Sequence, residues 1–419
     1  MDKRQFLKSI TASSLAFPFA GKEFDRILSG YERHTPDEIA QDDDFWRQIR
    51  GEYRLKTDSI NLENGYFCIA PQSTFNAFLK NVADLNYQGS YYMRTRLADD
   101  KIAVRKLLAN FAGCPFEEII VTRNTTESMD TVIAGIDWKA GDEAVMAEQD
   151  YGSMLDMFKL QARRYGIVNK IISVPNHPTT DDEIVSLYET AITPKTRLLM
   201  VCHMINISGQ ILPVKKICEM AHRHGVEVLV DGAHAFAHFK FDLMDLGCDY
   251  YGSSLHKWLS VPIGTGMLYV RKDKIAKLWP IFGDSGYPDD DIRKLNHTGT
   301  HPIHTELTIG AAIEFHQKLG SERKEARLRF LQEYWTKQVR DLPGIVVNTP
   351  RESHRACAIA NVGVTKLKPA ELARILLEKY KIWTVAIDYA NIHGCRITPN
   401  VFTTTQELDA LVKALKELA

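Results

Sequence analysis

The chain has 419 residues, a length that predicts two or three domain-sized pieces, or one large domain with a smaller companion. Its 45% of hydrophobic and 25% of charged residues are typical of a globular protein. Its 52 basic and 53 acidic residues give a formal net charge of −1, so no overall field favours nucleic acid or an anionic membrane surface. Seven cysteines stand singly without a CxxC pair, and no apolar run is long enough to cross a bilayer. These features argue against a disulfide framework, a cysteine zinc site and a transmembrane span.

Residues 1–21 differ in character from the rest of the chain. The basic segment KRQFLK, residues 3–8, precedes a short, weakly apolar stretch that ends at Ala20-Gly21. This order is typical of an export signal, and the segment is similar to a twin-arginine signal with lysine in place of the first arginine. We therefore predict a periplasmic or exported protein. The alternative is a cytoplasmic protein with an N-terminal arm.

After a predicted helical segment over residues 22–60, strand and helix patterns alternate. That first segment contains a helix over residues 36–50, which we expect to pack on the small domain or on a partner chain. Strands are predicted over residues 119–122, 143–146, 169–174, 198–202, 226–230 and 266–270, and helices over residues 127–135, 153–165 and 214–224. Apolar strands joined by helices predict an α/β fold with a mostly parallel, doubly wound sheet, in a large domain over residues 61–300.

A smaller α+β domain is predicted over residues 301–419. A long charged amphipathic helix over residues 322–341 precedes mixed segments, with strands near residues 344–348, 358–362 and 395–398. The closing helix, residues 405–418, has a polar start and apolar residues at helical spacing.

Two residues indicate the chemistry of the site. Asp231 ends the apolar strand in VLVDGAHA, residues 228–235, and Lys257 follows in SLHKW, residues 254–258. In doubly wound sheets, ligands bind beyond the carboxyl ends of the strands, which is where Asp231 is expected. Pyridoxal 5′-phosphate (PLP) needs a lysine that binds its aldehyde as a Schiff base and a carboxylate that keeps a proton on its pyridine nitrogen. We therefore predict a PLP-dependent enzyme with Lys257 and Asp231 as catalytic residues.

A candidate anion site lies in TRNTTE, residues 122–127, between a predicted strand and a predicted helix. Asn124 and Glu127 have the spacing of a capping box, so a helix begins here with free backbone amides. Helix N-termini attract anions, and the hydroxyls of Thr125 and Thr126 stand beside this one. The segment is either a phosphate site or an ordinary helix cap.

In this order the motifs resemble fold-type I PLP enzymes of the class V aminotransferase family, in particular the isopenicillin N epimerase-like branch with its exported, siderophore-tailoring members. The resemblance runs from about residue 61 to the C-terminus. It implies the fold, the cofactor and a homodimer with a shared active site, and it leaves the substrate open. It also implies a phosphate site formed by Thr125, Thr126, Ser254 and His256, with Gly299 and Thr300 of the neighbouring subunit.

The same resemblance assigns three residues around the cofactor ring. Tyr151 would stack on the pyridine and keep it covered, since an aromatic face suits a flat ring. Asn206 would lie near the ring hydroxyl and the substrate carboxylate, and His234 near the phenolic oxygen. For Tyr151 the alternative is a core residue.

Arginines supply candidate substrate contacts. Arg396, in CRITPN, is close to the family's Arg-Ile-Ser segment, and a guanidinium offers two parallel donors to a planar carboxylate. We predict that Arg396 binds the substrate's α-carboxylate; a surface salt bridge is the alternative. Arg94, with Arg96 nearby, is predicted to bind a distal acidic group. No metal is predicted, because His234 and His238 have helical ligand spacing without an HExxH motif.

With PLP as electron sink and Lys257 as general base, the fate of the carbanion at the substrate's α-carbon (Cα) sets the reaction. Proton return to the cofactor gives transamination, return to the opposite face of Cα gives epimerisation, and loss of a β-substituent gives C–S or C–N lyase chemistry. We predict aminotransferase or epimerase chemistry on an amino acid or a peptide-linked amino acid. The alternatives are a lyase and, in another class, an exported protein that binds PLP or an amine without catalysis.

Cysteine desulfurase chemistry by thiol attack is disfavoured by the sequence. Residues 382–389, which correspond to the loop of the nucleophile in related enzymes, contain no cysteine. Cys395 is adjacent to Arg396 in a predicted strand, so its side chain should point away from that arginine.

Overall fold

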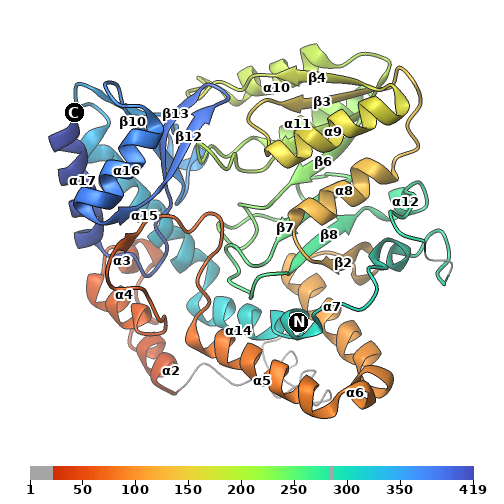
Figure 1. The fold of residues 1–419 in the computed structure, drawn as a ribbon, viewed down its shortest axis with the longest axis horizontal. Coiled ribbons are helices and arrows are strands. Elements are labelled where there is room, and N and C mark those ends of the chain that lie inside the picture. The colour runs from red at the N-terminus through yellow and green to blue at the C-terminus, as the bar shows by residue number, and fades with distance from the viewer. Residues whose placement is uncertain (1–21, 284–285) are drawn as a thin grey trace.

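The computed structural model describes residues 22–283 and 286–419, and the predicted export signal lies outside them (Figure 1). Two sheets with their helices lie side by side, a seven-stranded sheet at the right of the view and a four-stranded sheet at the left. In the part of the chain that is described, no helix combines the length and apolar character needed to cross a membrane.

The larger sheet has the strand order β2-β8-β7-β6-β5-β3-β4. Its strands are β2 (Ile119–Thr122), β3 (Glu143–Ala147), β4 (Val168–Ile172), β5 (Thr196–Cys202), β6 (Glu227–Asp231), β7 (Tyr250–Ser254) and β8 (Gly266–Val270). Only β8 runs against its neighbours, pairing antiparallel with β2 and β7. The predicted α/β fold with a mostly parallel sheet is confirmed. The sequence pattern missed β7 and did not predict the reversed direction of β8.

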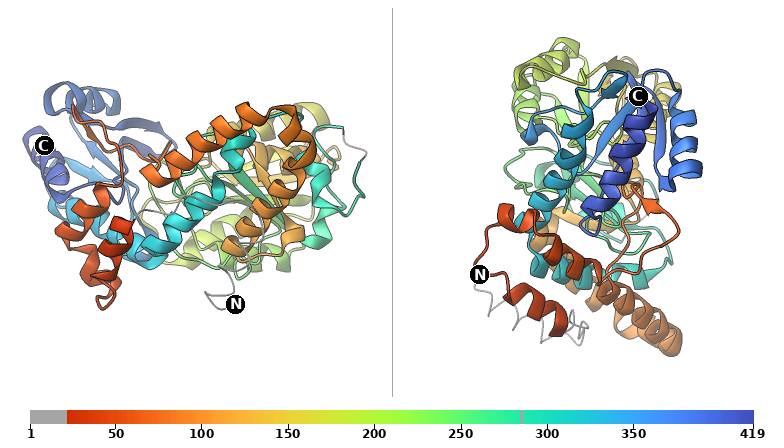
Figure 2. Two further views of the ribbon diagram at one scale, coloured as in Figure 1. Left: turned by 90° about the horizontal axis from the view of Figure 1, so that it is seen from below. Right: turned by 90° about the vertical axis from the view of Figure 1, so that its left-hand side faces the viewer.

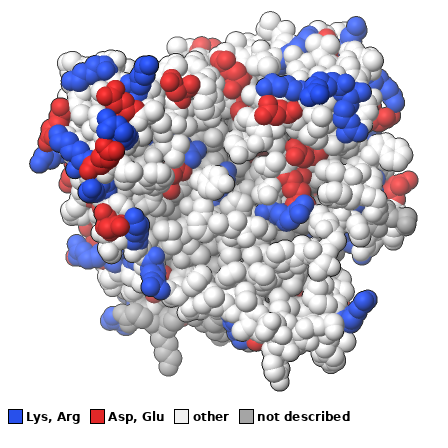
Figure 3. Space-filling model, in the orientation of Figure 1, with Lys and Arg blue, Asp and Glu red and all other residues white. Residues whose placement is uncertain are grey.

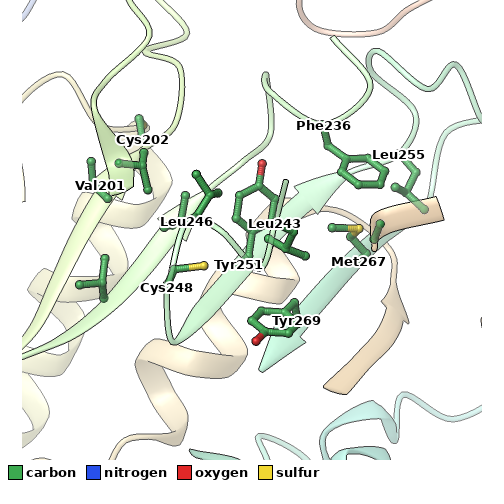
Figure 4. Packing of buried hydrophobic residues seen from close by; sticks show 14 of the residues in the cluster. Val201, Cys202, Phe236, Leu243, Leu246, Cys248, Tyr251, Leu255, Met267 and Tyr269 are labelled. Carbon is green, nitrogen blue, oxygen red and sulfur yellow. The ribbon is translucent and has the colours of Figure 1, made fainter. Parts of the chain in front are cut away.

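Different helices cover the two faces of this sheet, because alternate strand residues point to opposite sides. One face packs on α7 (Leu97–Ala112), α10 (Asp181–Ala191), α11 (Val214–Arg223) and α14 (Ile309–Leu319), the other on α8 (Thr125–Gly135) and α9 (Gly152–Tyr165). In β5, Leu199 and Val201 face the first set, and Leu198 and Met200 face the second. Figure 4 shows the first face, where Tyr251 of β7 lies near the cross-strand Tyr269 of β8.

The smaller part is built on an antiparallel sheet in the order β12-β13-β10-β9. Its elements are α15 (Ser321–Val339), β9 (Ile345–Val347), β10 (Ala360–Val364), α16 (Pro369–Tyr380), β12 (Val385–Tyr389), β13 (Ile392–Ile397) and α17 (Thr405–Leu418). Helices α15, α16 and α17 share one hydrophobic core with this sheet. The predicted α+β character is therefore confirmed. A parallel pair, β1 (Ile60–Asn61) with β11 (Ile382–Trp383), ties the segment before the large sheet to this part.

The N-terminal helices are α2 (Lys22–Ser29), α3 (Pro36–Ala40) and α4 (Asp43–Arg50). The single helix predicted over residues 36–50 is interrupted because Asp42 caps α4, accepting a hydrogen bond from the backbone N–H of Phe45 at 2.8 Å. These helices contact the smaller part. Arg50 of α4 pairs with Glu407 of α17 at 2.8 Å, and Arg327 of α15 donates to the carbonyl of Ala40 in α3.

Further helices complete the fold, and Figure 2 shows the molecule from two more sides. They are α5 (Gln72–Gln88), α6 (Ser90–Thr95), α12 (Lys272–Ile275), α13 (Ile303–Glu306) and the 3-10 turns η1 (Phe116–Glu118), η2 (Ile292–Asn296) and η3 (Ser353–Arg355).

Candidate active site

A cavity of about 270 Å³ opens at the carboxyl ends of β5, β6 and β7, with β13 of the smaller sheet on its other side. This is the edge at which doubly wound sheets bind ligands. Predicted residues in its lining are Thr125, Thr126, Tyr151, Asn206, Asp231, His234, Ser254, His256, Lys257 and Arg396. The lining also contains residues to which the sequence assigned no cofactor or substrate contact: Gly65, Tyr66, Phe67, Arg123, Asn124, Cys202, Met204, Ala233, Ile263 and Gly264.

Lys257 lies in the turn after β7 and contacts a histidine whose tautomer is fixed. The Nζ of Lys257 is 3.0 Å from the Nε2 of His234, and the indole N–H of Trp258 donates to the Nδ1 of His234 at 3.4 Å. Because Nδ1 accepts, the neutral ring carries its proton on Nε2. Burial lowers the pKa of His234 well below its ordinary value, and the Lys257 cation lowers it further. His234 is therefore neutral, and its Nε2–H can donate to the Lys257 amine once that amine has lost its proton.

The Lys257 amine is prepared to lose its proton. Burial lowers its pKa to about 8, the nearby Asp231 carboxylate opposes this shift, and Arg396 adds to it. The unprotonated amine, the form that attacks carbonyl carbon and accepts protons, is therefore a minor fraction at neutral pH and the main form above about pH 8.

We expect the rate at which the apo-protein reacts with an added aldehyde cofactor to rise as the pH increases through about 8. Only the neutral amine attacks the aldehyde, and an ordinary lysine would reach its plateau only above its usual pKa of 10.5. Stopped-flow absorbance between about pH 6 and pH 10 measures this inflection, with free N-acetyl-lysine as the control for titration of the aldehyde itself. An inflection above about pH 10 would contradict the shift.

Asp231 occupies the end of β6, and its surroundings are rigid. Its Oδ1 accepts a hydrogen bond from the backbone N–H of Ala233 at 2.9 Å. A Cβ at the intervening Gly232 would lie 2.1 Å from the Tyr251 ring, so only glycine fits between strand and loop here. Burial raises the pKa of Asp231, while the Ala233 N–H and Lys257 lower it. The carboxylate is an acceptor that can hold a cationic ring N–H.

The start of α8 forms the anion end of the cavity. Asn124 caps the helix by accepting from the N–H of Glu127 at 2.8 Å, as its spacing predicted. The N–H and hydroxyl of Thr125 lie 2.9 and 2.7 Å from the hydroxyl of Ser254 at the end of β7. His256 donates from Nδ1 to the carbonyl of Thr265 at 3.0 Å, and burial lowers its pKa to about 4. His256 can thus donate to a phosphate only when the anion itself raises that pKa.

Two residues of the cavity lining, Tyr151 and Asn206, are suited to contact a flat ring. Tyr151 precedes α9 and keeps 43% of its surface exposed, so its ring can cover a ligand; it is not a core tyrosine. The Oδ1 of Asn206 is buried in the cavity lining and has no hydrogen-bond partner among the described residues. A buried unpaired amide group indicates a missing polar partner.

Arg396 on β13 is buried, and its guanidinium is already paired. Its Nε donates to the Oε2 of Glu63 at 3.0 Å and its Nη2 to Oε1 at 2.6 Å, while Nη1 donates to the carbonyl of Asn206 at 3.2 Å. The surface salt bridge considered from the sequence is therefore wrong, because this ion pair is buried. Glu63 was missed, since it lies 333 residues from its partner.

Three predicted residues do not line this cavity. Gly299 and Thr300 are exposed in the segment before α13, and Arg94 is exposed on α6. Their assignment to the neighbouring subunit and to a distal acidic group stays a prediction. Among residues 22–283 and 286–419, no group of three or more metal-ligating side chains comes together.

Comparison with known proteins decides the family. Residues 71–388 match the family described as aminotransferase class-V. The chain belongs to this family. It is 27% identical to isopenicillin N epimerase of Streptomyces clavuligerus over 89% of this chain and 98% of that protein. It is also 30% identical to a probable cysteine desulfurase of Halalkalibacterium halodurans, over 69% and 73% of the two chains. Cysteine desulfurase from Thermococcus onnurineus has the same fold (TM-score 0.79, 22% identity, 88% of this chain and 97% of that one).

Class-V aminotransferases use PLP, and the cavity fits it. The start of α8 with Ser254 offers donors for the phosphate, and Asp231 would hold the pyridine N–H. The unpaired Asn206 amide suits the ring hydroxyl, with Lys257 placed for the aldehyde. These groups lie at different points of one cavity, as a ring with three polar substituents requires.

Proposed function

We propose that this member of the class-V aminotransferase family acts on the α-amino group of an amino acid or a peptide-linked amino acid and moves a proton at its Cα. The observation that carries the proposal is the convergence of Lys257, Asp231 and Arg396 on one cavity from three different elements. When bound, PLP supplies the electron sink that makes the α-proton removable.

Each residue of the site then has a separate role in binding the substrate or moving its proton. Arg396 binds the carboxylate and so fixes how the Cα–H bond is oriented. Lys257, largely neutral above about pH 8, accepts the α-proton. His234 keeps a neutral N–H directed at this amine, and Asp231 retains the proton on the ring nitrogen. Aminotransferase and epimerase chemistry share these roles and differ in where the proton returns.

The cysteines do not support thiol attack. Residues 382–389 form β11 and β12 without a cysteine, and the thiol of Cys395 is buried 3.6 Å from the carbonyl of Pro369. Among the described residues that line the cavity, the one cysteine is Cys202 at the end of β5. Burial raises the pKa of its thiol well above the usual value, and the nearby Asp150 and Asp231 carboxylates raise it further. A thiolate nucleophile is therefore disfavoured here.

Solvent-deuterium exchange tests the proposal. We expect holoprotein in D₂O, screened against amino acids and small peptides, to introduce deuterium at Cα of its substrate, with a matching shift of the visible cofactor band. The mirror-image product without keto acid indicates an epimerase, and keto acid with pyridoxamine phosphate indicates an aminotransferase. Loss of a β-substituent without prior exchange would instead favour a C–S or C–N lyase. A shift of the visible cofactor band without deuterium exchange or product would favour a protein that binds PLP or an amine without catalysis.

We also propose a homodimer in which Gly299 and Thr300 of the partner complete the phosphate site. In a single chain both residues are exposed and lie outside the cavity lining, where a partner chain could use them, and the resemblance noted from the sequence implies a phosphate contact for them. Apolar side chains are exposed at the cavity mouth and along α5, where an interface would cover them: Tyr66, Ile263, Phe75, Leu79 and Val82. The lower part of the face in Figure 3, where α5 and α6 lie in Figure 1, carries few charged residues.

A further inference from the structure

The guanidinium of Arg396 is held by a carboxylate that does not line the cavity. Arg396 and Glu63 are 6% and 9% exposed, and two hydrogen bonds join the Nε–Nη2 edge of the arginine to the two oxygens of Glu63. Arg396 lines the cavity and Glu63 does not. The glutamate therefore approaches the arginine from the side away from the ligand.

Counting donors shows which edge is left for a substrate. A guanidinium has five N–H groups. Two bind Glu63 and one binds the carbonyl of Asn206, which leaves one on Nη1 and one on Nη2. Because the Nε–Nη2 edge is occupied, the Nη1–Nη2 edge is the other one that presents two nitrogens to a planar carboxylate, and one of these two, Nη1, also donates to Asn206.

Glu63 is itself fixed by the backbone around it. Its Oε1 accepts hydrogen bonds from the N–H groups of Gly65 at 3.1 Å and Tyr66 at 2.9 Å. A Cβ at Gly65 would lie 3.2 Å from the Cζ of Arg396, so the backbone approaches the guanidinium closely. The same segment is tied to the end of β13, since the N–H of Asn64 donates to the hydroxyl of Thr398 at 2.6 Å. Glu63 thus has little freedom to follow a moving arginine.

The pair also sets the charge of the site. A buried arginine without a partner would carry a large desolvation penalty, and Glu63 offsets it before any substrate arrives. A substrate carboxylate then meets a pair with no net charge, so its binding depends on how the free edge is oriented more than on attraction to an isolated cation.

We propose that Glu63 is a positioning residue: it orients Arg396 so that its free edge binds the α-carboxylate of the substrate. This inference rests on the proposed function, in which Arg396 binds that group. It predicts that loss of Glu63 weakens recognition of a carboxylate while reaction at the cofactor aldehyde is retained.

Two hydroxylamines test this without knowledge of the natural substrate. Aminooxyacetate carries a carboxylate and methoxyamine does not, and each condenses with the cofactor aldehyde and frees the Lys257 amine, which changes the visible absorbance. We expect wild-type holoprotein to prefer aminooxyacetate in apparent affinity, and Glu63→Gln to reduce this preference about 10- to 100-fold, the range for a lost hydrogen bond to a charged group. Affinity for methoxyamine and the cofactor band should not change.

Controls separate the possible outcomes. Glu143→Gln removes another buried glutamate that pairs with a lysine, Lys170 at 2.9 Å, away from the cavity, and should leave the preference unchanged. Glu63→Asp keeps the negative charge on a shorter side chain and should also reduce the preference for aminooxyacetate. This variant replaces Glu63→Gln in the test if the latter does not fold. An unchanged preference, or an increased one as expected if Glu63 competes with the ligand, would overturn the proposal. Equal affinity of wild-type protein for both probes would refute the carboxylate role of Arg396 itself.

Discussion

Lys257→Ala should remove the visible absorbance band of the bound cofactor and lower the turnover rate by about 10⁴-fold or more. The substitution takes away both the amine that binds the aldehyde and the base that accepts the α-proton. It leaves Asp231, the start of α8 and Arg396 in place, so PLP can still enter the cavity. Absorbance spectra of the purified variant with added PLP, together with the deuterium exchange rate, measure both effects.

The chain offers a matched control for this variant. Lys324 on α15 is buried, and burial lowers its pKa to about 8, as it does for Lys257. It donates to the carbonyl of Trp258 and does not line the cavity. Lys324→Met should therefore keep the band if the protein folds. A band that persists in Lys257→Ala would mean that another amine holds the cofactor.

The parts of the site that the sequence predicted are those that a short segment contains. Asp231 ends an apolar strand, and Ser254, His256 and Lys257 stand within four residues of one another. The strand-end rule predicted the place of Asp231, the residue type indicated Lys257, and the family resemblance implied Ser254 and His256. The cavity lining contains all four. Asn124 was predicted as a helix cap for the same local reason and caps α8.

The parts that it missed depend on contacts between distant segments. No local pattern marks Glu63, because its role is defined by an arginine 333 residues further along the chain. Strand β7, YYGSS, contains no β-branched residue, because close packing and contacts in the active site determine which residues stand there. A Cβ at Gly252 would lie 2.9 Å from the sulfur of Met129, and Ser254 binds Thr125. The break between α3 and α4 was missed because the spacing of apolar residues does not reveal that Asp42 starts a second helix as its N-cap.

Asp231→Asn is expected to have the second largest effect, a loss of about 10²–10⁴-fold in turnover with the cofactor still bound through Lys257. The asparagine oxygen can still accept from Ala233, so the loop should keep its conformation. The amide carries no charge, however, and cannot keep a proton on the pyridine nitrogen near neutral pH. Steady-state rates and the intensity of the visible band measure these two consequences separately.

The same variant makes a prediction that does not involve the bound cofactor. In the wild type, Asp231 raises the pKa of Lys257 against the effect of burial, and that pKa is about 8. Without the carboxylate, the largest effect that opposes burial is lost while burial and the Arg396 cation still act, so the pKa of the lysine should fall below about 8. The inflection in the reaction of the apo-protein with the aldehyde should therefore move to lower pH in Asp231→Asn. A shift to higher pH, or none, would mean that Asp231 does not act on the amine, and its proposed place beside the cofactor ring would then lose its main electrostatic support.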